Sequence, residues 1–330
     1  MITRVPGFLV GHASDFKNVT GCTVILCPPG TVGSADIRGS AAGTRQMDAL
    51  LGYHISTEVH GIMVAGGSAF GLDAAGGALE YLEGRGRGFD VTITRVPIVP
   101  TAVIYDLSVG NCRVRPDKAM GYAACQAAKS EIQGDGSIGA GVGATVGKLL
   151  GIPQAMKGGL GTAFLEGPEG LMVGALAVVN ALGDVVDPDT GEILAGVRTA
   201  PDSREFADAA QLIRQGVVRR RFGEPGASNT TIGVVATNGG LSREQARKIA
   251  QMGHNALART VRPVHTLFDG DVVFVLSHPE VEADLHVTGI LAEAALQQAI
   301  LSAVKSAHNL GVLPSYQDLR EGTALPLPQG

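Results

Sequence analysis

Two adjacent threonines, Thr230 and Thr231, follow Asn229 in the stretch GEPGASNTTIGVVATNGG, which covers residues 223–240. A threonine hydroxyl inside a chain is a poor nucleophile and needs a neighbouring base. If the bond before Thr230 were cut, the new α-amino group, whose ordinary pKa is about 7.7–8.0, would supply that base. The cut itself could be autocatalytic, with the hydroxyl attacking the preceding carbonyl and the resulting ester hydrolysing. The pattern therefore permits nucleophile and base on one residue.

The surroundings of this junction fit the same chemistry. Residues 217–228, VVRRRFGEPGAS, show no periodicity and combine three arginines with Gly, Pro and Ser, which is typical of an accessible linker. Residues 231–237 then resemble a buried strand. Asn229 tolerates unusual backbone angles, so strain can be stored at the bond. A plain Asn turn followed by threonines that open a strand explains the same letters.

Other patterns that could carry chemistry fail on their spacing. A phosphate-binding loop in GAGVGATVGKLLG, residues 139–151, would need Gly at 142 and Ser or Thr at 149, where the chain has Val142 and Leu149. The dinucleotide pattern GxGxxG fails in the same stretch. The eight histidines include no HExxH pair, and GGSAFG at 66–71 is not a GxSxG elbow. No metal or organic cofactor is therefore expected.

Composition narrows the class of protein. The chain has 330 residues, 45% of them hydrophobic, which is ample for a large core. A net charge of -5 gives no positive field for nucleic acid or an anionic membrane. The four cysteines form no CxxC pair and fit reduced thiols in the cytoplasm. No apolar leader is evident, and no run approaches the length that spans a bilayer. We expect a cytoplasmic protein without nucleic-acid or membrane partners.

Alternating strand-like and helix-like segments must position the junction. Short apolar runs bounded by Gly or Pro predict buried strands, and small-residue or amphipathic segments predict helices. Strands are expected at residues 22–27, 59–65, 171–180, 231–237 and 271–277; helices are expected at 68–86, 117–130, 203–216 (capped by Ser203), from the capping box SREQ at 242–245 onward, and at 290–311 (closed by Gly311). This mixture predicts a layered α/β architecture.

Eight blocks of sequence extend the argument beyond the junction. They are VGHASD, TGCTVILC, DIRGSAAGTRQMD, GGSAFGLDAA, VPIVPTAVIYDL, MKGGLGTA, NTTIGVVATN and HTLFDGDVVF. In these blocks the chain resembles the DmpA-type aminopeptidases, N-terminal-nucleophile hydrolases that include β-aminopeptidases and nylon-oligomer (6-aminohexanoate oligomer) hydrolases. Aminopeptidase members usually carry serine at the nucleophile position. With Thr230 there, and with FDGD, the chain is more similar to the nylon-oligomer branch.

The resemblance implies a fold and an assembly. The fold is a four-layer αββα sandwich of N-terminal-nucleophile type, with Thr230 at the start of an inner strand. The chain is a single domain, cut after Asn229 into an α chain (residues 1–229) and a β chain (residues 230–330). Such αβ pairs form a homo-oligomer, a tetramer by analogy. The substrate is a small amide or peptide.

The resemblance also assigns roles near the nucleophile. Lys148, in GATVGKLLG, matches a lysine of the nylon-oligomer hydrolase site; its ammonium would keep the Thr230 amine neutral and stabilise developing negative charge. Lys157, in MKGGLGTA, competes for this role, and spacing alone does not distinguish the two. Asn180 matches an asparagine that donates to the oxyanion. An exposed lysine and an ordinary strand-end turn are the simpler explanations.

Further matches concern the pocket. Asp269 and Asp271 match an acidic pair that would orient the amine or the lysine. Tyr105 matches a tyrosine that lines the pocket and can bond a substrate carbonyl. Gly66, Gly67 and Ser68 form a turn at a predicted helix start, where backbone N–H groups can face a substrate. A DG hairpin turn, a core tyrosine and close helix packing explain these residues as well.

The resulting expectation is an autoprocessed amide hydrolase that forms an acyl-enzyme on Thr230. Its candidate substrates are N-terminal residues of short peptides or β-peptides, and linear ω-amino-acid oligomers such as nylon fragments. One alternative is an acyltransferase of the ornithine acetyltransferase type, which uses the same threonine chemistry but passes the acyl group to an amine. The other is an unprocessed, non-catalytic relative, which predicts an intact chain.

Overall fold

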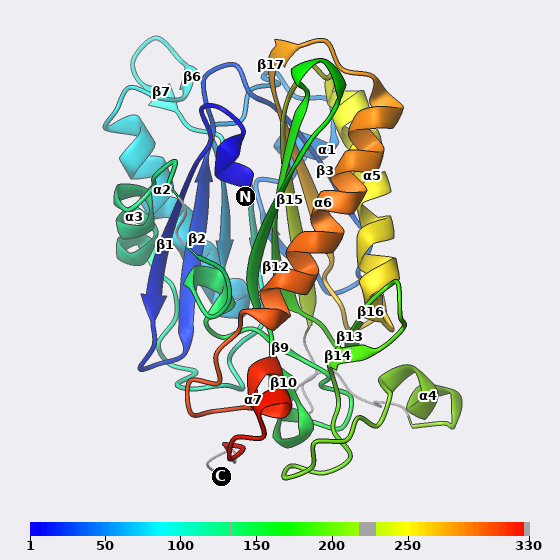
Figure 1. The fold of residues 1–330 in the computed structure, drawn as a ribbon. Helices are drawn as coiled ribbons and strands as arrows, with labels where there is room; N and C mark the ends of the chain where they lie inside the picture. Colours follow the sequence, from blue (N-terminus) through cyan, green and yellow to red (C-terminus); the bar gives the residue numbers. More distant parts are fainter. Residues whose placement is uncertain (132–133, 218–228, 327–330) are drawn as a thin grey trace.

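The computed structural model contains two five-stranded β-sheets that face each other (Figure 1). It describes residues 1–131, 134–217 and 229–326. The first sheet has the strand order β1-β2-β5-β8-β4 and the second β11-β12-β15-β17-β3. The strands are β1 (Leu9–Asp15), β2 (Thr20–Leu26), β3 (Val32–Ile37), β4 (Gly43–Arg45), β5 (Gly61–Ala65), β6 (Phe89–Asp90), β7 (Arg95–Val96), β8 (Thr101–Val103), β9 (Thr145–Val146), β10 (Met156–Lys157), β11 (Gly159–Glu166), β12 (Met172–Asn180), β13 (Asp184–Val186), β14 (Ile193–Ala195), β15 (Thr230–Gly239), β16 (Val261–Arg262) and β17 (Val272–Val281).

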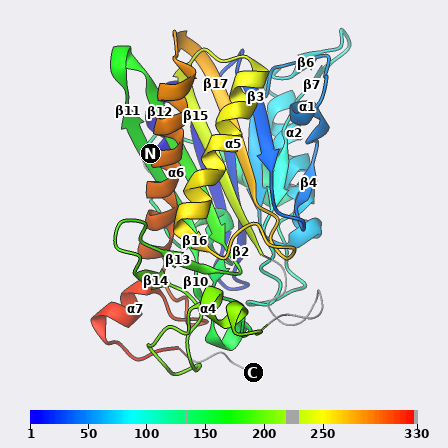
Figure 2. The same cartoon turned by 90° about the vertical axis from the view of Figure 1, so that its right-hand side faces the viewer.

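Helices cover both outer faces of the sheet pair (Figure 1), with α2 and α3 on the first sheet and α5 and α6, which lie in front in Figure 2, on the second. The helices are α1 (Asp48–Leu51), α2 (Ala74–Glu83), α3 (Lys118–Gln126), α4 (Ala209–Arg214), α5 (Arg243–Thr260), α6 (Leu285–Lys305) and α7 (Tyr316–Glu321), with short 3-10 turns at Ile2–Arg4, Ser68–Asp73, Gly139–Gly141, Ile152–Gln154 and Pro168–Gly170. Between the sheets, Ile25 and Ile62 of the first pack in one core with Val234 and Phe274 of the second. The predicted four-layer αββα sandwich is confirmed.

The strand that begins at Thr230 lies in the middle of its sheet. β15 pairs with β12 in antiparallel and with β17 in parallel orientation, and each of its residues is buried. An apolar run with both faces covered is typical of such a central strand. The expectation that Thr230 starts an inner strand is therefore correct.

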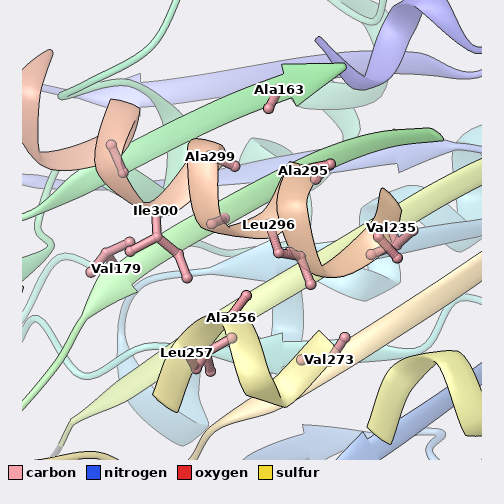
Figure 3. Packing of buried hydrophobic residues seen from close by; sticks show 14 of the residues in the cluster. Ala163, Val179, Val235, Ala256, Leu257, Val273, Ala295, Leu296, Ala299 and Ile300 are labelled. Atoms are coloured by element: carbon pink, nitrogen blue, oxygen red, sulfur yellow. The ribbon is translucent and has the colours of Figure 1, made fainter. Parts of the chain in front are cut away.

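Leu296 is one of the buried residues through which helix α6 packs on this sheet. A Cβ on Gly233 of β15 would lie 2.9 Å from Leu296 Cδ2, and a Cβ on Gly253 of α5 would lie 2.9 Å from Leu296 Cδ1. The two glycines thus leave the space that the Leu296 side chain fills. Figure 3 shows Leu296 among the neighbouring residues of this buried cluster. Glycine at both positions is explained by this close approach.

Replacing Leu296 with alanine is expected to lower the free energy of unfolding by about 2–5 kcal/mol, because it removes buried methyl groups and leaves a cavity. Ile290 lies on the same helix and is 61% exposed. Ile290→Ala is the matched control and should change the free energy by no more than about 0.5 kcal/mol. Urea unfolding of both variants measures the difference, and equal losses would contradict the packing described above.

The helix expected at residues 203–216 is shorter than predicted. α4 begins at Ala209, where the Asp208 carboxylate accepts a hydrogen bond from the Gln211 N–H at 2.9 Å. Ser203 is not its cap; its carbonyl accepts from the fully buried Arg198 guanidinium at 3.3 Å. A buried guanidinium needs acceptors, so the preceding segment wraps around Arg198 instead of coiling.

The last long helix also differs from its prediction. α6 starts at Leu285, capped by Asp284, and ends at Lys305, so Gly311 lies beyond it. By length and composition α6 could cross a membrane, contrary to the expectation that no run approaches that length. More than half (56%) of its most apolar stretch is buried inside the protein, against the second sheet, as in a core helix. The other expected strands and helices are present, although the first residues of the 68–86 segment form a 3-10 turn. From residue 218 on, the predicted linker lies outside the described residues.

Candidate active site

The predicted catalytic residues meet at one end of the second sheet, where β9, β10, β13, β14 and β16 gather (Figure 1). Asn180 ends β12 and lies directly opposite Thr230, the first residue of β15. Asp271 immediately precedes β17, whose Val272 pairs with Ile232. Residues far apart in sequence are therefore brought together by the register of three neighbouring strands.

The bond between Asn229 and Thr230 has an unusual hydrogen-bond arrangement. The Thr230 hydroxyl donates to the Asn229 carbonyl oxygen at 2.6 Å, and the Gly270 backbone N–H donates to the same oxygen at 2.8 Å. Asn229 is 1% and Thr230 4% exposed, so this bond is buried. The hydroxyl thus lies beside the carbonyl that it would attack, and the oxygen that would become negative already has an N–H donor.

Two buried carboxylates hold the backbone around this bond. Asp269 accepts from the Leu182 N–H at 3.3 Å and from the Thr266 N–H and hydroxyl at 3.0 and 2.5 Å. Asp271 accepts from the Thr231 N–H at 2.7 Å. Burial, reinforced by the nearby charge of Asp271, raises the pKa of Asp269 to about 6. Asp269 and Asp271 do not belong to a hairpin turn, since β17 pairs with β15 and β3. The role of these two carboxylates in orienting an amine or lysine stays a prediction.

Lys148 and Asn180 form a buried polar network. The Lys148 ammonium donates to the Asn180 side-chain oxygen at 2.8 Å and to its carbonyl oxygen at 3.1 Å. The Thr145 N–H donates to the same side-chain oxygen at 3.0 Å, while Asn180 Nδ2 donates to the Tyr105 carbonyl at 3.1 Å. These contacts fix which way the carboxamide faces and leave one Nδ2 hydrogen for another acceptor. They involve the backbone of half-buried Tyr105, so the pocket role of its phenol stays a prediction.

Lys157 lies in a different environment. Its ammonium donates to the carbonyl oxygens of Val142 and Ala144 at 2.6 and 2.9 Å. Burial lowers the pKa of Lys157 to about 7, against the opposing attraction of Asp106. Of the two competing lysines, Lys148 is therefore the one that contacts Asn180.

Lys157 should make the stability of the chain depend on pH. Its folded-state pKa of about 7 lies below the 10.5 of an ordinary lysine, so the unfolded chain binds more protons between these values. The free energy of unfolding should therefore rise with pH across this window, by at most about 1.4 kcal/mol per pH unit from this group. Urea unfolding of uncleaved Thr230→Ala protein near pH 7 and near pH 9 measures the rise. Adding Lys157→Met should flatten it; an unchanged slope would contradict the assignment.

The turn at residues 66–68 uses its own donors. Its three backbone N–H groups bond within the protein: Gly66 to the Gly21 carbonyl at 2.9 Å, Gly67 to the Asp106 carboxylate at 2.7 Å and Ser68 to the Ile104 carbonyl at 3.0 Å. Those N–H groups therefore stabilise the turn, whereas the sequence led us to expect that they face a substrate. Contact between this turn and a substrate stays a prediction.

Two groups at the site were not singled out from the sequence. The Gly270 N–H faces the Asn229 carbonyl, and His265 contacts Asp271. Both residues belong to the block HTLFDGDVVF, but the sequence of that block does not indicate their contacts. The one feature of the sequence that could have drawn attention to Gly270 is its position between two acidic residues. In the structure, a Cβ on Gly270 would lie 2.8 Å from the Ala41 carbonyl oxygen. Among the described residues, no group of three or more His, Cys, Asp or Glu could hold a metal ion.

Comparison with known proteins covers nearly the whole chain. Residues 1–313 match the model of peptidase family S58. An uncharacterized aminopeptidase of Mycobacterium tuberculosis is 42% identical, over 97% of this chain and 98% of that protein. A 6-aminohexanoate-oligomer endohydrolase of Kocuria sp. (strain KY2) is 31% identical, over 91% of this chain and 84% of that protein.

A solved structure shows the same fold at low sequence identity. The L-aminopeptidase D-Ala-esterase/amidase of Ochrobactrum anthropi, a variant of the Ntn hydrolase fold, superposes with a TM-score of 0.69 and 18% identity. The match covers 93% of this chain and 86% of that one. The αββα sandwich described above is thus a known architecture.

Proposed function

This chain belongs to peptidase family S58 and is an amide hydrolase of the N-terminal-nucleophile type; from that premise we propose that it cuts itself between Asn229 and Thr230 and then uses Thr230 as its nucleophile. One observation carries the proposal. The Thr230 hydroxyl and the Gly270 N–H both bond the carbonyl oxygen of Asn229.

The self-cleavage step follows from this arrangement. Thr230 Oγ1 attacks the Asn229 carbonyl carbon, and the Gly270 N–H stabilises the negative charge that forms on the carbonyl oxygen. The C–N bond then breaks, the amine takes the proton that the hydroxyl lost, and an ester joins the two parts. Water hydrolyses the ester to give the Asn229 carboxylate, the free hydroxyl and the free α-amine.

The burial of this bond supports cleavage from within. A second protease would have to draw the start of β15 out of the sheet, because both residues at the bond are buried. Ladder hydrogen bonds with β12 and β17 oppose that movement. An attacking group supplied by the chain itself needs no such opening.

Hydrolysis of a substrate would use the same threonine. The α-amine of Thr230, with an ordinary pKa of about 7.7–8.0, takes the proton from the hydroxyl as it attacks an amide carbonyl. A positive charge on Lys148 would favour the neutral amine, and the remaining Nδ2 hydrogen of Asn180 is suited to the oxyanion. Asp269 and Asp271 fix the surrounding backbone. The substrate C–N bond then breaks, the leaving amine takes the proton that the α-amine received, and water hydrolyses the resulting ester to release the acyl group and the free hydroxyl.

For substrates we propose short peptides, β-peptides or ω-amino-acid oligomers, with Tyr105 and the 66–68 turn lining the pocket. One relative is named for hydrolysis of 6-aminohexanoate oligomers and others for aminopeptidase activity. Hydrolysis of a peptide, a β-peptide and a 6-aminohexanoate oligomer, compared by kcat/KM, separates these classes. The family match favours hydrolysis over acyl transfer, and incubation with acetylornithine and glutamate tests the latter. We further propose a cytoplasmic homo-oligomer of αβ pairs.

The first test is the mass of the purified protein under denaturing conditions. Two chains, residues 1–229 and 230–330, are expected in place of one chain of 33.8 kDa. Fragments with another boundary would remove Thr230 as the new N-terminus. A single intact chain without hydrolytic activity after prolonged incubation would favour an unprocessed, non-catalytic protein.

A further inference from the structure

His265 contacts Asp271, whose carboxylate binds the backbone at the start of β15. Its ring Nδ1 is 2.8 Å from Asp271 Oδ2, and its backbone N–H donates to the same oxygen at 3.1 Å. The other oxygen of Asp271 accepts from the Thr231 N–H at 2.7 Å. Asp271 therefore bridges His265 and the residue directly after Thr230.

The backbone and ring of His265 are suited to this contact. Its φ of 55° is in the left-handed region, which few residues other than glycine adopt. Its side chain is 18% exposed, and its ring meets the His254 ring edge-on with centroids 4.8 Å apart. Within the described chain, His265 Nε2 is buried without a hydrogen-bond partner. The Asp271 contact therefore assigns the ring proton to Nδ1 as a donor.

We infer that His265 is a positioning residue: through Asp271 it holds the start of β15 so that the Thr230 hydroxyl stays against the Asn229 carbonyl. A carboxylate bound through one oxygen can rotate about its last torsion, whereas one bound through both oxygens from opposite sides cannot. Without the His265 ring, that oxygen would keep only the longer contact at 3.1 Å to the backbone N–H of residue 265, and Asp271 could turn more easily away from the Thr231 N–H. The inference rests on the proposed function, because it assigns Thr230 the reacting hydroxyl.

The charges around His265 favour the same orientation. Asp271 contacts His265 Nδ1, and His254, which bonds the Asp36 carbonyl at 3.0 Å, meets the His265 ring edge-on. Arg38 pairs with the Asp36 carboxylate at 2.9 Å. Burial lowers the pKa of His254 to about 4, so that ring is neutral near pH 7 and does not repel His265. Asp271 is thus the acceptor in hydrogen-bonding distance of His265 Nδ1.

Three variants at this position test the inference. Asparagine, glycine and aspartate all accept a positive φ, so backbone strain does not separate them. His265→Asn keeps an N–H donor at the position of Nδ1, His265→Gly removes it, and His265→Asp replaces it with a negative charge. The full chain is made by cell-free synthesis, and the cleaved fraction is followed over time by intact mass.

His265→Gly is expected to slow self-cleavage about 10- to 100-fold, because a factor of this size corresponds to the usual free-energy contribution of a hydrogen bond to a charged group. His265→Asp should be slower still, and His265→Asn should recover most of the rate. In cleaved protein, β-alanyl-p-nitroanilide hydrolysis should lose kcat with little change in KM. Thermal unfolding of each variant in a Thr230→Ala background reports any loss of folding separately.

The outcomes are distinguishable. Equal rates for the Asn and Gly variants, whether fast or slow, would overturn the positioning role, because only the donor at Nδ1 separates them. A loss of rate that follows only the loss of thermal stability would overturn it as well. A wild-type chain that stays intact would remove the proposed self-cleavage together with this inference, and that result is read from the wild type alone.

Discussion

Replacing Thr230 with alanine is expected to leave one chain of 330 residues that hydrolyses no amide. The variant lacks the hydroxyl that lies 2.6 Å from the Asn229 carbonyl oxygen, so no ester can form and no α-amine is released. Loss of a nucleophile of this kind lowers turnover by about 10⁴-fold or more. Intact mass and hydrolysis of the substrate panel measure the two effects in one preparation.

The neighbouring threonine supplies a matched control. The Thr231 hydroxyl is buried and has no hydrogen-bond partner within the described residues, so Thr231→Val should cleave and hydrolyse nearly as the wild type does. Thr230→Ser keeps a hydroxyl and should retain both reactions at a changed rate. Cleavage or hydrolysis by Thr230→Ala would contradict the nucleophile assignment, and so would complete inactivity of Thr231→Val in a folded protein.

The central strand was predictable because the evidence for it is local. The run TIGVVAT predicts a buried strand at residues 231–237, and β15 starts one residue earlier, at Thr230, as the family resemblance implied. The capping box at 242–245 likewise predicted the start of α5. In both cases neighbouring residues determine the structure, so the pattern along the chain is sufficient.

Other parts depend on contacts that no local pattern encodes. The amphipathic pattern of residues 203–216 predicted a longer helix, but the buried Arg198 takes the carbonyls of Pro201 and Ser203 as acceptors. His265 adopts a positive φ and binds Asp271, six residues along the chain. The register that sets Asn180 against Thr230 joins positions fifty residues apart in the sequence. Each of these required the folded structure.

The choice between the two lysines is the clearest case of this kind. Lys157 pairs with Thr145 in the two-stranded β9–β10 sheet, and Lys148 follows β9 by two residues. Both are fully buried, so burial does not separate them. The two lysines differ in the direction of the side chain. Lys148 points towards Asn180, and Lys157 points towards the carbonyls of Val142 and Ala144.

Lys148→Met is therefore expected to lower kcat by about 100- to 1000-fold, the usual cost of removing one charge-stabilising group from an active site. It removes the donor that holds the Asn180 side-chain oxygen and a positive charge near Thr230. Lys157→Met, a matched change of another buried lysine, should lower the thermal stability and leave kcat per cleaved chain within about tenfold. The reverse order of effects would identify Lys157 as the catalytic lysine.

A double-mutant cycle shows whether Lys148 acts through Asn180. Asn180→Leu removes the carboxamide that accepts from Lys148 and that is expected to donate to the oxyanion. If the lysine acts mainly by orienting this group, the double variant Lys148→Met/Asn180→Leu should be little slower than Asn180→Leu alone. If the two losses instead multiply, the lysine charge acts directly on the amine of Thr230 or on the oxyanion. Because the cycle compares kcat per cleaved chain, slower self-cleavage in any variant does not enter the result.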